Sequence, residues 1–160
     1  MNPTPGEVIN LLVDAGATVA TCESLTGGMI CAELTSVPGS SQVVLGGMIT
    51  YATTLKTTLA GIDSGLIETH GVVSREVGVA MAESASEICG ADYGIGVTGV
   101  AGPGPLDGIE AGTVWVGVKG PQGCVGELLH EQGDREAVRT AVVGHALWLL
   151  SMIIQQGRAE

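Results

Sequence analysis

The residue best suited to nucleophilic chemistry is Ser24, which lies in the stretch TCESLTGG at positions 21–28. A serine between a strand and a helix sits where backbone N–H groups and the positive end of the helix converge. Such donors suit a phosphate group or a developing oxyanion. The same position also suits a helix N-cap, because serine is a favoured capping residue, and the local pattern by itself favours the cap. The G-x-S-x-G elbow of the α/β hydrolases is not matched.

A nucleophilic serine needs a base, and Lys56 is one of two lysines in the chain. A neutral lysine in a dry pocket can take the serine proton, and burial lowers a lysine pKa toward that neutral state. The alternative is a solvated lysine on the surface. Tyr51 ends the apolar segment before this lysine. It can orient the lysine or a substrate, and the alternative is a buried aromatic residue with a satisfied hydroxyl.

Two glycine-rich turns offer further hydrogen-bond donors. Gly27 and Gly28 follow the serine closely, and Thr98 leads into a loop that contains Gly99 and Gly102. Hydroxyls and backbone N–H groups in such turns can line a pocket for a small molecule. Glycine loops are common in proteins without such a pocket, so these residues are a weak signal when taken alone.

The segment GDREAVR at 133–139 places Arg135 and Arg139 four residues apart at the start of the last expected helix. Like charges at this spacing repel each other, so a shared anionic target would explain the pair. Ion pairs with Glu131 or Glu136 explain it equally well. Both interpretations remain open from the sequence.

Composition and charge exclude several classes of protein. The net charge is −11, with 17 acidic and 6 basic residues, which argues against a nucleic-acid binder. The four cysteines lack C-x-x-C spacing and the three histidines lack ligand spacing, so we expect no metal and no disulfide framework. The most apolar stretch, 140–154, is too short for a membrane span. A reduced, cytoplasmic protein without a membrane partner is the expected class.

Helical and strand patterns alternate along one domain that covers residues 1–160. Thr4 opens a capping box, Ser74 and Asp134 are expected N-caps, and Gly90 is an expected helix end. The expected helices are 5–16, 24–35, 53–61, 75–90 and 135–154, and the expected strands are 17–22, 42–51, 92–99, 113–118 and 124–130. The last two strands read as an antiparallel hairpin. This order predicts an α/β fold, a three-layer α/β/α sandwich with a mixed sheet.

Taken together, the motifs resemble one family. The segments ESLTGG, VPGSS, GGMITYATTLK, HGVVS, GADYGIGVTGVAGPG, GTVWVGV and GDREAVR occur here in the order and spacing of the CinA C-terminal domain family. The resemblance runs from about Thr18 to the last helix. Known members are nicotinamide mononucleotide deamidases, which release ammonia from the carboxamide. Some carry an additional N-terminal domain, and this chain looks like the stand-alone form.

The resemblance implies roles for individual residues. Ser24 matches the family's nucleophile, Lys56 its base-like lysine, Tyr51 its tyrosine and Thr98 its active-site hydroxyl. Tyr51 or a water would then help to pass a proton to the departing ammonia. The substrate-binding arginine matches Arg135 better than Arg139. The glycines that we expect beside the substrate are Gly27, Gly28, Gly99 and Gly102. No cofactor is implied, the partner is a small nucleotide, and a homodimer is expected.

The chain also departs from the family pattern. Leu25 stands where a cysteine often follows the nucleophile in the family, so no second nucleophilic side chain lies next to Ser24 in the sequence. YATTLK replaces the usual YSNEAK, and GPGPLDGIEAGT lacks the usual Lys-Pro pair. The alternative function is therefore a non-catalytic module that binds a nucleotide or a partner on the same fold. A Rossmann dehydrogenase is excluded, because no G-x-G-x-x-G follows a strand.

Overall fold

A computed structural model of the protein describes residues 1–159. The strands are β1 (Val19–Glu23), β2 (Val44–Ile49), β3 (Tyr93–Gly99), β4 (Thr113–Gly120) and β5 (Gly123–His130). The helices are α1 (Pro5–Ala15), α2 (Met29–Thr35), α3 (Thr53–Thr58), α4 (Ser64–His70), α5 (Arg75–Cys89) and α6 (Arg135–Ala159), with a short 3-10 turn, η1, at Ser40–Gln42.

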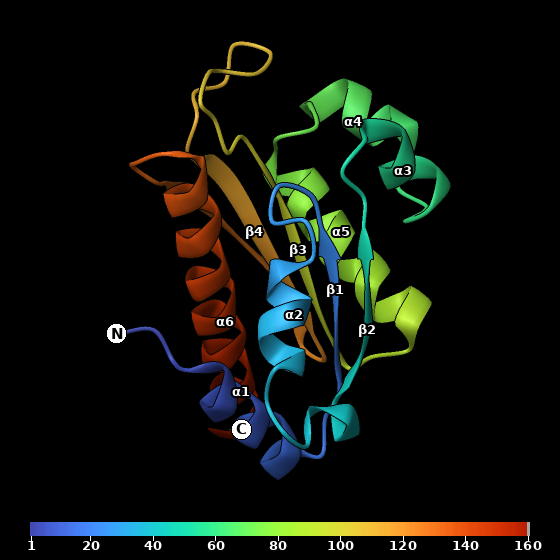
Figure 1. Ribbon diagram of the computed structural model, residues 1–160. Helices are drawn as coiled ribbons and strands as arrows, with labels where there is room; N and C mark the ends of the chain where they lie inside the picture. Colours follow the sequence, from blue (N-terminus) through green and yellow to red (C-terminus); the bar gives the residue numbers. More distant parts are fainter. Residues whose placement is uncertain (160) are drawn as a thin grey trace.

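The five strands form one open, mixed sheet in the order β2-β1-β3-β4-β5. β1 pairs in parallel with both β2 and β3. β4 runs antiparallel to β3 and forms a hairpin with β5, as the sequence predicted. Because β1, β2 and β3 are parallel, their carboxyl ends meet at one edge of the sheet, at the top of Figure 1.

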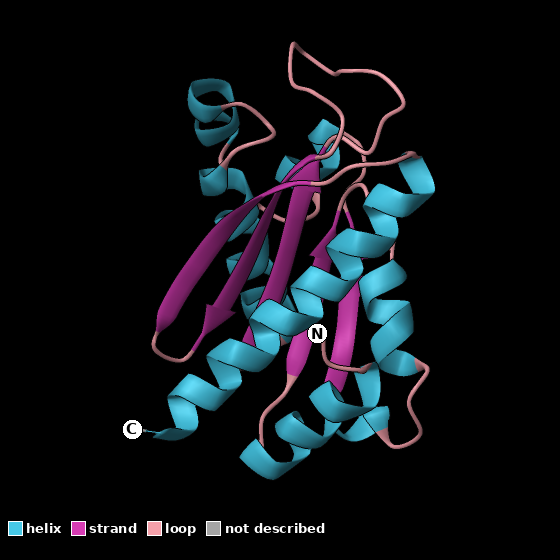
Figure 2. Ribbon diagram, turned by 90° about the vertical axis from the view of Figure 1, so that its left-hand side faces the viewer, coloured by secondary structure: helices cyan, strands magenta, loops and turns pink. Residues whose placement is uncertain are grey.

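Helices cover both faces of the sheet, which confirms the three-layer α/β/α prediction. α1, α2 and α6 lie on one face, and α6 runs diagonally across the sheet in Figure 2. α5 lies on the other face. Each face has its own apolar core: Leu12, Ile30 and Leu150 belong to the first, while Met48 and Met81 belong to the second.

The contact between β3 and α5 depends on small residues. A Cβ atom added at Gly94 or Gly96 would collide with the α5 backbone at Gly78 and Ala82. The helix therefore packs directly on the backbone of the strand, because the glycines on this face of β3 leave room for it.

The capping predictions hold. Thr4 and Glu7 form the reciprocal capping box of α1. The Ser74 hydroxyl accepts a hydrogen bond from the backbone of Val77, and the Asp134 carboxylate accepts one from Ala137. These are local contacts within one turn of chain, which is why the sequence alone reveals them.

Other element predictions were wrong in instructive ways. The helix expected from Ser24 begins at Met29, because Gly27 and Gly28 take positive φ angles of 59° and 101° and insert a turn. α4 was not predicted, since it is short and has no buried residue to produce an apolar period. Ile88 lies near the end of α5 and is exposed despite its apolar side chain. His145, in the apolar part of α6, is half-buried, and its Nε2 atom lies 2.7 Å from a Glu127 carboxylate oxygen.

α6 extends beyond the apolar stretch that the sequence suggested. The segment Arg135–Arg158 is long and apolar enough to cross a membrane by length and composition, so the expectation that it was too short is wrong. Half of its most apolar window is buried inside the protein. It also packs on α1 and on β4, as a core helix of a globular domain does.

Candidate active site

The predicted site residues gather at the edge of the sheet where β1, β2 and β3 end. Ser24 follows β1, Tyr51 and Lys56 follow β2, and Thr98 is near the end of β3. The N-terminus of α6, with Arg135, reaches the same edge. In open α/β sheets this is where ligands bind.

Ser24 and Lys56 are in direct contact. The Lys56 Nζ atom lies 3.0 Å from the Ser24 Oγ atom and donates a second hydrogen bond to the Thr50 main-chain oxygen at 2.6 Å. The lysine side chain is 1% exposed, so the alternative of a solvated surface lysine is wrong. Burial lowers the pKa of Lys56 from 10.5 to about 8. Near neutral pH a useful fraction of the lysine is therefore an uncharged amine beside the serine hydroxyl.

No hydrogen bond joins Tyr51 to Lys56 within residues 1–159. Its side chain is 60% exposed, so it is not the buried aromatic residue of the alternative interpretation. Its hydroxyl accepts a hydrogen bond from Arg135 Nη2 at 3.1 Å. Arg135 also donates from Nη1 to the Gly102 carbonyl at 2.7 Å. Arg135 thus links the segment after β2 to the glycine loop after β3.

Arg139 contacts a different segment. Its Nε atom donates to the Leu25 carbonyl at 2.9 Å, and its Nη2 atom donates to the Thr26 carbonyl at 3.4 Å. Neither arginine forms an ion pair within residues 1–159, so the pairing expected with Glu131 or Glu136 is absent there. Arg135 thus joins the Tyr51 segment to the Gly102 loop, and Arg139 contacts the loop that follows Ser24.

Thr98, Gly99 and Gly102 shape the rim of the site, which is the edge of the sheet where β1, β2 and β3 end. The Thr98 side chain is buried and its hydroxyl donates to the Val72 carbonyl at 2.8 Å. A Cβ at Gly99 would lie 2.6 Å from the Thr113 carbonyl, so this glycine is required by the packing of β4. Gly102 has a φ of 97°, which favours glycine at the turn that Arg135 contacts.

Sequence reasoning missed Glu23, although it precedes the nucleophile directly. Its carboxylate is buried and accepts hydrogen bonds from the Thr26 hydroxyl at 2.7 Å and from the backbone of Ile30 and Cys31 at 2.9 and 3.0 Å. A carboxylate with donors around it is the usual partner for a helix N-terminus. Successive side chains of a strand point to opposite faces of the sheet. This rule places the Glu23 carboxylate on the opposite face from Ser24, and it was the one signal in the sequence that could have indicated its separate role.

Glu23 changes the source of hydrogen-bond donors at the site. The N-terminus of α2 is directed at Glu23, so the expectation that it faces a ligand beside Ser24 is wrong, as is a capping role for Ser24. Donors are present in the loop itself. The backbone N–H groups of Leu25 and Thr26 have no acceptor among residues 1–159. An unpaired N–H beside a nucleophile suits an oxyanion.

Metal ligation and disulfides find no support in the described part of the chain. No group of three or more His, Cys, Asp or Glu side chains there is arranged to hold an ion. The four cysteines are free thiols.

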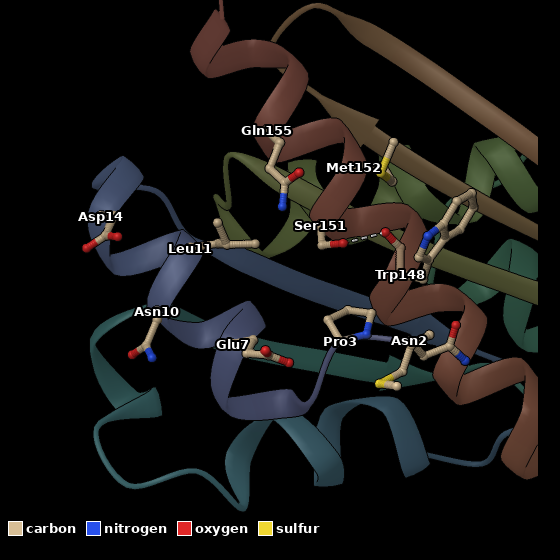
Figure 3. Close-up of a pocket in the computed structure, with 11 residues that line it drawn as sticks. Asn2, Pro3, Glu7, Asn10, Leu11, Asp14, Trp148, Ser151, Met152 and Gln155 are labelled. Carbon is tan, nitrogen blue, oxygen red and sulfur yellow. Dashed lines mark hydrogen bonds between the residues drawn. The ribbon is translucent and has the colours of Figure 1, made fainter.

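A large groove of the protein lies elsewhere. Figure 3 shows that it runs between α1 and α6, with Leu11, Trp148 and Met152 among the residues that line it. Its volume is about 590 Å³, and none of the predicted site residues borders it.

Comparison with known proteins decides the family. The family model described as the CinA C-terminal domain matches residues 2–154. The chain belongs to the CinA C-terminal domain family. A CinA-like protein of Frankia casuarinae is 42% identical over 149 residues, which cover 93% of this chain and 34% of the relative. A putative competence-damage inducible protein of Geobacillus kaustophilus is 42% identical over 151 residues, covering 92% of this chain and 36% of the relative.

This CinA domain spans about a third of the length of those curated relatives. Solved structures of similar length also match. A CinA superfamily protein from Klebsiella pneumoniae aligns with a TM-score of 0.92 at 27% identity, covering 96% of both chains. The competence/damage inducible protein CihA from Agrobacterium tumefaciens aligns with a TM-score of 0.85 at 32% identity, covering 97% of this chain and 99% of that one. The α/β fold is thus that of the CinA structures.

Proposed function

We propose that this protein is an amidohydrolase that converts nicotinamide mononucleotide and water to nicotinate mononucleotide and ammonia. The observation that carries the proposal is the contact of 3.0 Å between Lys56 Nζ and Ser24 Oγ in a buried setting. A serine with an adjacent neutral base is the arrangement that acyl transfer needs. The motif resemblance to nicotinamide mononucleotide deamidases supplies the substrate.

The first half of the reaction forms an acyl-enzyme. The Ser24 oxygen attacks the carboxamide carbon while neutral Lys56 takes the hydroxyl proton. The carbonyl oxygen becomes an oxyanion, and the loop N–H groups of Leu25 and Thr26 are the proposed donors to it. Collapse of this intermediate breaks the C–N bond, and the lysine ammonium returns its proton to the leaving nitrogen, which departs as ammonia.

The second half releases the acid. A water molecule gives a proton to Lys56 and attacks the ester carbon, and the Ser24 oxygen leaves and takes the proton back. The products are nicotinate mononucleotide and free enzyme. No redox partner enters this sequence.

Arg135 is the proposed phosphate contact. It is exposed at the rim, and in the free protein its guanidinium donates to the Tyr51 hydroxyl and to the Gly102 carbonyl. A planar guanidinium suits two-pronged recognition of a phosphate. Tyr51 and the turn at Gly102 would then border the nucleotide. We further propose a cytoplasmic homodimer that acts on this small nucleotide and binds neither nucleic acid nor membrane.

The test is ammonia release from nicotinamide mononucleotide by the purified protein. Ser24→Ala and Lys56→Ala should fold and lose ammonia release, whereas Ser41→Ala and Lys119→Ala, which alter residues away from the rim, should keep it. A Ser24→Ala protein with near-normal turnover would remove Ser24 as the nucleophile. Saturable mononucleotide binding without ammonia would favour the non-catalytic module instead.

A further inference from the structure

Arg139 holds the loop that carries the nucleophile. It lies in α6, 114 positions from Leu25, and its guanidinium is half-buried against two successive main-chain carbonyls, those of Leu25 and Thr26. It forms no ion pair within residues 1–159. A Cβ at Gly27 would lie 3.4 Å from Arg139 Nη2, which places the guanidinium directly against this turn.

The contact has a directional consequence for the peptide between Leu25 and Thr26. In a planar trans peptide, the C=O of one residue and the N–H of the next point in opposite directions. Because the Leu25 carbonyl points at Arg139, the Thr26 N–H points away from α6. Thr26 is fully buried, and its N–H finds no acceptor in the described chain. A buried donor without a partner calls for an explanation.

We propose that Arg139 is a positioning residue that turns the Thr26 N–H into the site as an oxyanion donor, and that it does not bind the substrate phosphate. The inference rests on the proposed function and assigns the two arginines separate tasks. A charged donor on the Leu25 carbonyl also polarises the peptide, which makes the N–H at its other end a stronger donor. Glu23 holds the same loop from the α2 side through the Thr26 hydroxyl.

A pair of substrates separates positioning from phosphate binding. Nicotinamide mononucleotide has the phosphate, and nicotinamide riboside has the same amide without it. Arg139→Met should lower kcat for both by a similar factor, up to about 100-fold, with little change in KM. Arg135→Met should raise KM for the mononucleotide only. Arg158→Met, on the same helix as Arg139, is the matched control and should leave both reactions unchanged.

The opposite pattern overturns the inference. If Arg139→Met raises KM for the mononucleotide and leaves turnover of the riboside unchanged, Arg139 binds phosphate. If kcat is unaffected with both substrates, it has no part in the reaction. Circular dichroism and thermal melting check the fold of each variant. If Arg139→Met fails to fold, Arg139→Lys replaces it, because lysine retains one donor for the Leu25 carbonyl. The same comparison then applies: the factor by which kcat falls for the mononucleotide is set against the factor for the riboside.

A second readout does not depend on the nucleotide. A fluorophosphonate reacts with an activated serine: the Ser24 oxygen bonds to phosphorus, fluoride leaves, and Lys56 takes the proton. Mass spectrometry of the intact protein follows the rate. Slower labelling of Arg139→Met than of Arg158→Met supports the positioning role even if the mononucleotide is not the substrate. Equal labelling rates would overturn that role, whatever the outcome of the ammonia assay.

Discussion

Lys56 donates a hydrogen bond to the main-chain oxygen of Thr50 at 2.6 Å, and this contact fixes the amine beside Ser24. The carbonyl belongs to the residue that follows β2, so the edge of the sheet itself orients the base. The pKa of about 8 follows from the burial of this lysine. Two of the predictions below concern the protonation of this amine.

The rate of ammonia release should follow the neutral form of Lys56. Below its pKa of about 8 the amine is protonated and cannot accept the serine proton. We expect kcat/KM to rise about tenfold per pH unit from pH 6 and to level off above about pH 8. Initial rates measured across pH 6–10 test this. A plateau that begins near pH 6 would show that Lys56 is not the titrating base.

The same lysine should make stability depend on pH. Its pKa is about 8 in the folded protein and 10.5 when unperturbed, so between these values the unfolded chain binds more protons. The free energy of unfolding therefore rises with pH across this window, and the cost of burying the charge is fully present below pH 8. Lys56→Met removes that cost. The free energy of unfolding of the variant, measured relative to that of the wild type, should therefore be higher at pH 7 than at pH 10 by about 2 kcal/mol.

Denaturant unfolding at the two pH values measures this difference, with Lys119→Met as the control. Lys119 is the other lysine, and it reaches the Asp92 carbonyl at the opposite edge of the sheet at 3.4 Å. A Lys56→Met stability difference that is the same at pH 7 and pH 10 would contradict the lowered pKa.

Replacing Glu23 with glutamine should weaken the loop. The amide nitrogen of glutamine would face N–H or O–H donors that now point at carboxylate oxygens, so at least one donor loses its acceptor. A buried donor left unpaired costs about 1–3 kcal/mol. We expect Glu23→Gln to lower the denaturation midpoint and to reduce turnover together. Glu33→Gln on the exposed side of α2 should do neither.

A methyl group at Gly96 should disturb the packing of α5. Its Cβ would meet the backbone of Gly78 and Ala82, which cannot move as a flexible side chain can. Overpacking of this kind costs about 1–3 kcal/mol. Gly104→Ala is the control, because nothing lies within 4 Å of a Cβ at that position. Thermal melting of both variants checks the prediction, and equal melting temperatures would contradict it.

The sequence predicted those features that depend on neighbouring residues or on the ends of strands. Caps at Thr4, Ser74 and Asp134 are readable because each contact lies within one helical turn. Ser24 and Lys56 were expected at one edge because both follow strands of a parallel set, and the sheet order bears this out.

Other features depend on contacts that no local pattern reveals. The start of α2 was misplaced because Gly27 and Gly28 insert a turn after Ser24, and the N–H groups of the helix then bond to Glu23 in the preceding strand. The hydrogen bond between Arg139 and Leu25 joins residues 114 positions apart. The sequence pattern indicates only that Arg139 lies on a helix. The folded chain shows that it donates to the Leu25 carbonyl.

That separation has a consequence for how the protein forms on the ribosome. The nucleophile and its base precede β3 and α6 in the chain, but β1 needs β3 as its neighbour, and Arg139 comes from α6. The Ser24 loop therefore lacks its contacts with Arg139 until α6 has left the ribosome. A nascent chain truncated before α6 would contain both Ser24 and Lys56. It would still lack the hydrogen bonds from Arg139 that hold the Ser24 loop.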